Sequence, residues 1–144
     1  MQSKKYKFQH STPIQIRFND IDIMAHVNNS IYQNYFDLAR TQYFEQVFQS
    51  TIDWKKEALV LAKITIEYFN PTFLDERIEV LSTIYKLGTK SLRMFQQVIN
   101  SETKEVKAEN KAILVSFGVE ENSAIPIPNK WKNKIITFEK EIEY

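Results

Sequence analysis

One uninterrupted helical pattern, between residues 30 and 48, constrains the fold of this chain more than any other feature of its sequence. Apolar side chains recur there at intervals of three and four residues, without an intervening Gly or Pro, at Ile31, Tyr32, Tyr35, Phe36, Ala39, Tyr43 and Val47. Ser30 and Gln33 have the spacing of a capping box, which predicts that the helix begins near Ser30. Aromatic residues on so much of one helix favour burial against a sheet and also against a partner subunit.

Alternating polar and apolar residues predict strands on both sides of this helix in the sequence. Before it, Ile14, Ile16 and Phe18 alternate with polar residues, which predicts a strand over residues 13–18. After it, the same period predicts four more strands, over residues 62–68, 76–87, 91–100 and 106–119. Between the second and third of these, Gly88 stands where a two-residue hairpin loop would begin, so we expect a tight turn there.

Together these patterns predict an α+β fold in which one antiparallel sheet curls around one long helix. The 144 residues suit a single domain with one core, over residues 1–144. Ten Phe and seven Tyr can make that core substantial. A weaker helical pattern over residues 128–140 places Trp131, Ile135 and Phe138 on one side.

The composition argues against several kinds of protein. A formal net charge of +1 disfavours a dedicated nucleic-acid binder and gives no electrostatic reason to bind a membrane. There is no Cys, so disulfides and a Cys nucleophile are excluded, and we expect a cytoplasmic location. No apolar run has the form of a signal peptide or the length of a membrane span.

The sequence also gives no indication of a metal or another cofactor. His10 and His26 are too few and too far apart for a zinc site. Asp20 and Asp22 resemble the start of a calcium loop, but the Gly and Glu that such a loop requires are replaced by Ala25 and Ile31. We therefore expect neither a bound metal nor another cofactor.

The polar segment before the long helix combines groups that could carry out chemistry, namely Asp20, Asp22, His26, Asn28 and Asn29. A helix N-terminus offers unpaired backbone N–H groups and a partial positive charge, which can hold an oxyanion or polarise a carbonyl. A carboxylate a few residues upstream can reach the same place. These are two of the parts that acyl-group hydrolysis requires.

Residues 20–40 contain Asp-x-Asp-x-x-x-His-Val-Asn-Asn-x-x-Tyr-x-x-Tyr-x-x-x-Ala-Arg, which resembles the signature of hotdog-fold acyl-CoA thioesterases of the 4-hydroxybenzoyl-CoA thioesterase type. The resemblance implies hydrolysis of an acyl-CoA thioester to a free acid and coenzyme A. It also implies a homodimer or homotetramer whose sheets join edge to edge, with active sites at the subunit interface. Ala25 departs from the pattern, because the family usually has Gly there.

The motif suggests a role for each of its polar residues. Asp22 aligns with the catalytic carboxylate of the family, as general base or as nucleophile, although an Asx-turn explains it equally simply. His26, Asn28, Asn29 and Tyr32 would support the active site, and backbone amides at the helix start would stabilise the oxyanion. Their ordinary explanations are a loop anchor for the histidine, helix capping for the asparagines and core packing for the tyrosine.

Three further motif residues are expected to be structural. Asp20 can bond backbone amides of the loop, and Tyr35 can pack in the core or in an interface. Arg40 can pair with a carboxylate within the domain or across subunits. We therefore assign no chemistry to them.

Substrate contacts are less clearly marked in the sequence. Coenzyme A carries phosphates, which attract basic groups at the mouth of a pocket, and the candidates by position are Lys63, Lys86, Lys90 and Arg93. Met24 is expected beside the acyl chain. Two other functions stay open, namely hydrolysis of a thioester carried by acyl carrier protein and non-catalytic binding of an acyl thioester, which Ala25 would favour.

Overall fold

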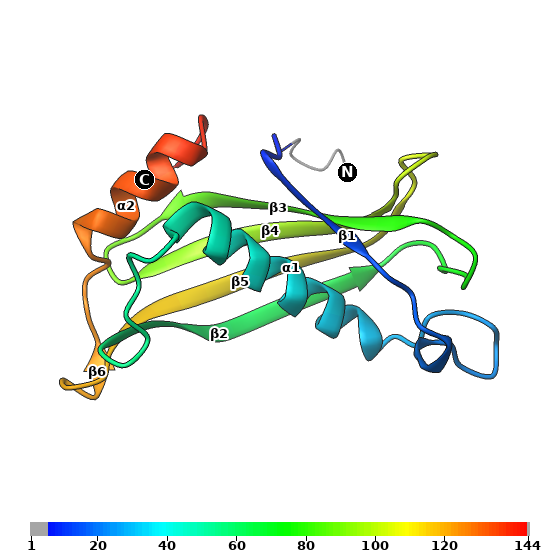
Figure 1. The fold of residues 1–144 in the computed structure, drawn as a ribbon, viewed down its shortest axis with the longest axis horizontal. Coiled ribbons are helices and arrows are strands. Elements are labelled where there is room, and N and C mark those ends of the chain that lie inside the picture. Colours follow the sequence, from blue (N-terminus) through cyan, green and yellow to red (C-terminus); the bar gives the residue numbers. More distant parts are fainter. Residues whose placement is uncertain (1–5, 144) are drawn as a thin grey trace.

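The computed structural model describes residues 6–143, in which six strands form one antiparallel sheet and a long helix crosses one face of it (Figure 1). The strands run in the order β1-β3-β4-β5-β2, and β6 pairs with the end of β5. In chain order the elements are β1 (His10–Ile14), a 3₁₀ turn (Phe18–Asp20), α1 (Ile31–Phe48), β2 (Glu57–Tyr68), β3 (Ile78–Leu87), β4 (Ser91–Asn100), β5 (Val106–Gly118), β6 (Ser123–Ala124) and α2 (Asn129–Phe138). The predicted α+β fold, an antiparallel sheet around one long helix, is confirmed.

The sheet covers the apolar face of α1 better than the sequence pattern suggested. Its aromatic residues Tyr32, Tyr35, Phe36 and Tyr43 are buried within this one chain. The opposite face is mainly polar and exposed, with Gln33, Asn34, Thr41, Gln42 and Glu45. The aromatic content of the helix is therefore no argument for a partner subunit.

The predicted capping box is not formed. α1 begins at Ile31, but the side chain of Ser30 makes no capping hydrogen bond and its backbone is already helical. Instead, the side-chain oxygen of Asn28 accepts the backbone N–H of Ser30 at 3.0 Å and its hydroxyl at 2.9 Å. An Asx-type turn two residues earlier thus takes the place of the box.

The first strand lies earlier in the chain than its alternation predicted. β1 begins at His10 and ends at Ile14, while Phe18 belongs to the 3₁₀ turn and is 81% exposed. The carboxylate of Asp20 accepts the backbone N–H of Arg17 at 3.0 Å, and the backbone N–H of Asp20 donates to the Arg17 carbonyl at 2.9 Å. These local bonds turn the chain and end the extended segment.

Two strand boundaries also differ from the prediction. β2 begins at Glu57, before the predicted start at residue 62. A register shift between Leu61 and Lys63 puts the first half of the strand out of phase with the alternation that starts at residue 62, so the sequence pattern did not reveal that half. The β3–β4 loop comprises the three residues between Leu87 and Ser91, and Gly88 does not adopt a positive φ there. The Gly88 N–H donates to the Ser91 carbonyl at 2.8 Å, so Gly88 precedes the tight turn and does not begin it as predicted.

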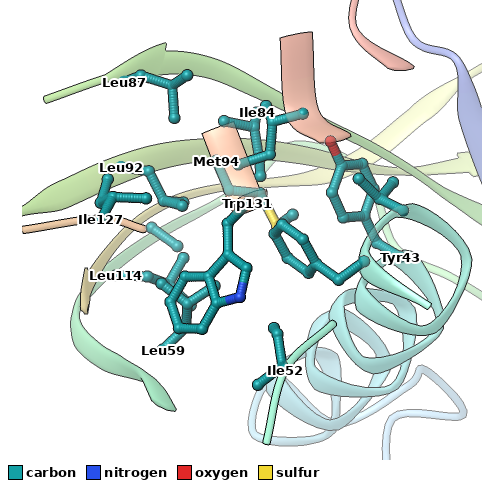
Figure 2. Packing of buried hydrophobic residues seen from close by; sticks show 14 residues of the cluster. Tyr43, Ile52, Leu59, Ile84, Leu87, Leu92, Met94, Leu114, Ile127 and Trp131 are labelled. Carbon is teal, nitrogen blue, oxygen red and sulfur yellow. The ribbon is translucent and has the colours of Figure 1, made fainter. Parts of the chain in front are cut away.

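The core consists of two apolar clusters along α1. One surrounds the C-terminal half of α1 and includes Trp131 of α2 (Figure 2), and the other surrounds the N-terminal half, next to the motif. Between them lies a buried polar row in register across three strands, formed by Ser82, Gln96 and Asn110. Gln96 Nε2 donates to Ser82 Oγ and to the Phe36 carbonyl, both at 3.0 Å. The row ties the middle of the helix to the sheet.

A buried carboxylate joins the end of α2 to the sheet and to α1. Glu139 is 2% exposed and accepts hydrogen bonds from Tyr43 Oη at 2.7 Å, Thr83 Oγ1 at 3.0 Å and the Ile84 backbone N–H at 3.3 Å. Burial raises the pKa of Glu139, and the three donors only partly offset that effect.

We expect this carboxylate to make stability depend on pH. Because the folded-state pKa of Glu139 lies above its unfolded value, the free energy of unfolding is largest below the unfolded pKa and falls as pH rises through the folded pKa. Each tenfold difference in proton affinity between the folded and unfolded states corresponds to about 1.4 kcal/mol. Glu139→Gln, which keeps the shape without the charge, should remove this component in urea titrations that start at the ordinary glutamate pKa of about 4 and extend upward in pH. The same pH slope in both proteins would contradict the prediction.

Candidate active site

The loop between β1 and α1 carries the motif and is called the motif loop. The side chain of Asp20 anchors this loop to α1. This side chain is 1% exposed, and Tyr35 Oη on α1 donates to its Oδ2 at 2.7 Å. The Asp20 carbonyl also accepts the backbone N–H of Asn28 at 2.8 Å, which brings the two ends of the loop together. Burial, and then the bond to this carboxylate, raise the pKa of Tyr35.

Asp22 lies at the start of a tight turn on the surface side of that loop. Its Oδ1 accepts the backbone N–H of Met24 at 2.9 Å, and its carbonyl accepts that of Ala25 at 3.0 Å. Its own N–H donates to the carbonyl of His26 at 2.9 Å. The side chain is half-buried, and within residues 6–143 no hydrogen bond is formed to its Oδ2. One carboxylate oxygen therefore holds the turn while the other can accept a proton.

Ala25 occupies the one backbone conformation in this loop that favours glycine. Its φ is 63°, in the left-handed region, and its methyl group is exposed. The departure from the family pattern therefore costs backbone strain but does not block the turn that holds Asp22.

The strain at Ala25 gives a direct prediction. Ala25→Gly should raise the free energy of unfolding by about 1 kcal/mol, because an L-residue in the left-handed region costs about 1–2 kcal/mol and glycine loses part of that gain through its greater backbone freedom. Urea unfolding followed by circular dichroism measures the change. Destabilisation by the glycine would show that the exposed methyl group contributes more than the strain.

The backbone amides at the start of α1 are mostly engaged. The N–H of Asn28 donates to Asp20, that of Ser30 to the Asn28 side chain, and that of Ile31 to the Asn28 carbonyl. Asn29 N–H makes no hydrogen bond to the described part of the chain. The sequence indicated the backbone N–H groups at the helix start, residues 28–31, as oxyanion donors. Of these, the N–H of Asn29 is the one that the described chain leaves free to bind an oxyanion.

A surface cavity of about 270 Å³ opens beside the motif. Its lining includes the predicted residues His26, Asn29 and Tyr32, together with residues 68–71 from the end of β2, whereas Asp22 and Asn28 are outside that lining. Tyr68 Oη donates to the Asn29 carbonyl at 3.0 Å. The ring of His26 contacts that of Phe73 edge to face at a centroid distance of 5.0 Å.

The other predicted substrate residues are spread over the chain. Met24 is 68% exposed beside Asp22, and Lys63 is exposed on β2. Lys90 lies in the β3–β4 loop, next to α2 and at the far end of α1 from Asp22 (Figure 1). Lys86 and Arg93 flank that same loop. A single subunit therefore does not bring these basic residues to the motif.

Arg40 of the motif forms a local ion pair rather than a distant one. Its guanidinium bonds the carboxylate of Asp37, one turn earlier on α1, and is largely buried. The sequence allowed Arg40 to pair within the domain or across subunits, and the described chain forms the pair within the domain.

No signal in the sequence indicates that the segment 69–77, between β2 and β3, supports the site. Thr72 is fully buried, its carbonyl accepts the Val27 N–H at 2.8 Å, and its hydroxyl bonds Tyr32 Oη at 2.9 Å. Burial raises the pKa of Tyr32, which keeps its hydroxyl protonated. Asn70-Pro71 marked a turn, but a turn signal does not say which segment it contacts.

An antiparallel sheet wrapped around one long helix is the hotdog fold. The chain belongs to the thioesterase-like superfamily, whose family model matches residues 16–135. This membership confirms the predicted family and the prediction of a thioester hydrolase.

Individual thioesterases are similar to this chain in sequence and in structure. FadM of Escherichia coli (strain K12), a long-chain acyl-CoA thioesterase, is 26% identical over 128 residues, 86% of this chain and 95% of FadM. The acyl-CoA thioester hydrolase YbgC of Escherichia coli O157:H7 is 27% identical over 92 residues, 62% of this chain and 69% of YbgC. A thioesterase of Thermus thermophilus, solved with coenzyme A and Zn, is 28% identical with a TM-score of 0.80, covering 93% of this chain and 96% of that one.

One further property follows from the helices alone. No helix within residues 6–143 is long and apolar enough to cross a membrane.

Proposed function

We propose that this protein hydrolyses acyl-CoA thioesters to a free acid and coenzyme A, with Asp22 as the catalytic carboxylate. The observation that carries the proposal is the turn at residues 22–25, which holds Asp22 by one oxygen and leaves the other without a hydrogen bond from the described chain. The names of FadM and YbgC support acyl-CoA as the donor. The cavity beside His26 and Tyr32 supports binding of the thioester at the same loop.

The chemistry requires few protein groups, because a thiolate is a good leaving group. Asp22 either takes a proton from water, which attacks the thioester carbonyl, or attacks that carbonyl itself to form an acyl-enzyme anhydride that water then opens. In both routes the C–S bond breaks, the thiolate takes up a proton, and the Asn29 N–H stabilises the negative charge on the carbonyl oxygen. A single turnover in ¹⁸O water separates the routes, since only the second can leave ¹⁸O in the Asp22 carboxylate.

We also propose that two copies associate through β2. In the described chain this strand pairs only with β5, so one edge of its 12 residues is free, and a long free edge is a template for pairing with another chain. Apolar side chains next to it and around the motif are exposed, among them Ile23, Met24, Val60, Tyr68, Phe69 and Phe73. A second copy would cover them and bring its own basic residues toward Asp22.

The association can be measured directly. We expect sedimentation velocity to give a mass of at least twice that of one chain at micromolar concentration. Val60→Asp, which puts a charge on the exposed edge strand, should weaken association about tenfold or more, because association would bury the new carboxylate without a partner. Gln42→Asp, on the exposed polar face of α1, is the matched control. A monomeric wild type would contradict the proposal.

The activity is tested by thiol release from a panel of acyl-CoAs, from acetyl to palmitoyl and including benzoyl and phenylacetyl. Turnover of any member supports the proposal, and the preferred chain length gives the substrate class. Failure across the panel overturns acyl-CoA as the substrate. The same acyl groups on acyl carrier protein, measured in parallel, then distinguish a carrier-protein thioesterase from a binding subunit.

A further inference from the structure

A buried ion pair lies beneath the segment that contacts the motif loop. Lys107 on β5 is 3% exposed, and its Nζ lies 2.7 Å from Glu76 Oε1 and also bonds the carboxylate of Glu105. Burial opposes the charge on Lys107, but the hydrogen bonds to Glu105 and Glu76 outweigh it and raise the Lys107 pKa. Taking two charges out of water is costly, so a hydrophobic pair would serve a purely packing role at least as well. The charges therefore indicate that this pair does more than fill space in the core.

The pair holds the chain on both sides of Thr72. Lys107 Nζ donates to the carbonyl of Pro71 at 3.1 Å. The backbone N–H of Phe73 donates to Glu76 Oε2 at 2.7 Å. The residues before and after Thr72 are thus bonded to the two partners of one ion pair, which fixes the peptide groups around it.

Thr72 passes this constraint to the Asp22 loop. Its carbonyl accepts the Val27 N–H at 2.8 Å, and its hydroxyl lies 2.9 Å from Tyr32 Oη at the start of α1. The residue before Val27 is His26, whose carbonyl accepts the N–H of Asp22 at 2.9 Å. An unbroken series of short contacts therefore joins β5, the 69–77 segment and the turn that carries the carboxylate.

We propose that Lys107 and Glu76 are positioning residues for Asp22. The inference rests on the proposed function of Asp22, and neither residue is taken to touch the substrate. A carboxylate that activates water or attacks a carbonyl must be placed within a fraction of an ångström, and a displacement of about 1 Å can lower a rate by about 10². The ion pair supplies that placement through its hydrogen bonds to the backbone on both sides of Thr72.

The decisive variant is Lys107→Met, which removes the ammonium group and keeps an unbranched side chain. We expect kcat on the fastest acyl-CoA substrate to fall about tenfold to a hundredfold, with KM changed less than about twofold. Hydrogen exchange of the backbone amides of Val27 and Phe73 should accelerate in the same variant, because their acceptors lose their support. Glu76→Gln, which is nearly isosteric, should show the same changes to a smaller extent, and it serves if Lys107→Met does not fold.

Tyr43→Phe is the control for general destabilisation. It removes one buried hydrogen bond, to Glu139, at the other end of α1, and should leave kcat and the exchange of Val27 unchanged. Wild-type kcat and exchange in both Lys107→Met and Glu76→Gln would overturn the inference, as would an equal loss of kcat in Tyr43→Phe or a rise in KM alone. If wild type turns over no substrate, the proposed function fails, while the exchange measurement still tests whether the ion pair supports the loop.

Discussion

Replacing Asp22 by Asn is expected to lower kcat for acyl-CoA hydrolysis about 10²–10⁴-fold, the range that a positioned acid–base group contributes. The amide oxygen of Asn can still accept the Met24 N–H that Asp22 Oδ1 accepts at 2.9 Å, so the turn should be retained. The amide cannot take a proton from water or form an anhydride. Thiol release, with circular dichroism and urea unfolding of the same samples, separates lost chemistry from lost structure.

Asp20→Asn is the matched control, because it makes the same chemical change two residues away. Asp20 is buried and accepts the Tyr35 hydroxyl and the Arg17 N–H, so its charge is used inside the protein. We expect its loss to lower the free energy of unfolding by about 1–3 kcal/mol, with a smaller effect on kcat than Asp22→Asn. Equal turnover in wild type and Asp22→Asn would remove Asp22 from the mechanism.

The long helix and most of the strands could be predicted because their signals are local. The range of β4 was predicted without error, and that of β5 to within one residue, since alternation and turn residues lie within each segment. Prediction was wrong where a side chain competes with the backbone. Asp20 turns the chain after β1, and Asn28 replaces the capping box at Ser30.

The support of the site could not be predicted, because it depends on contacts between distant segments. Thr72 bonds Val27 and Tyr32, and Lys107 bonds Pro71, across separations of about 40 residues in sequence. Neither residue belongs to the motif, and an isolated Thr or Lys has no pattern of its own. The basic residues are candidates by their position near strands and a hairpin, a criterion that cannot tell which end of the sheet faces Asp22.

Trp131→Ala is expected to have the largest effect on stability, a loss of about 3–5 kcal/mol in the free energy of unfolding. Trp131 is fully buried in the cluster around the C-terminal half of α1 (Figure 2). Its ring lies 6.1 Å from that of Phe48. Its Nε1 donates to the Thr51 carbonyl at 3.4 Å. Substitution leaves a cavity the size of an indole and one unpaired carbonyl, which the surrounding strands cannot close completely.

The second tryptophan provides a control of the same type. Trp54 is about half exposed and contacts Phe44 at the surface, so Trp54→Ala should cost about 1 kcal/mol. Urea titrations followed by circular dichroism, at one fixed protein concentration, give both values. Because Trp131 packs in a different cluster from the motif loop, the folded fraction of Trp131→Ala should keep the kcat of wild type. A fall in kcat per folded molecule would show that the two clusters are coupled across the polar row of Ser82, Gln96 and Asn110, so that the far end of α1 helps to position Asp22.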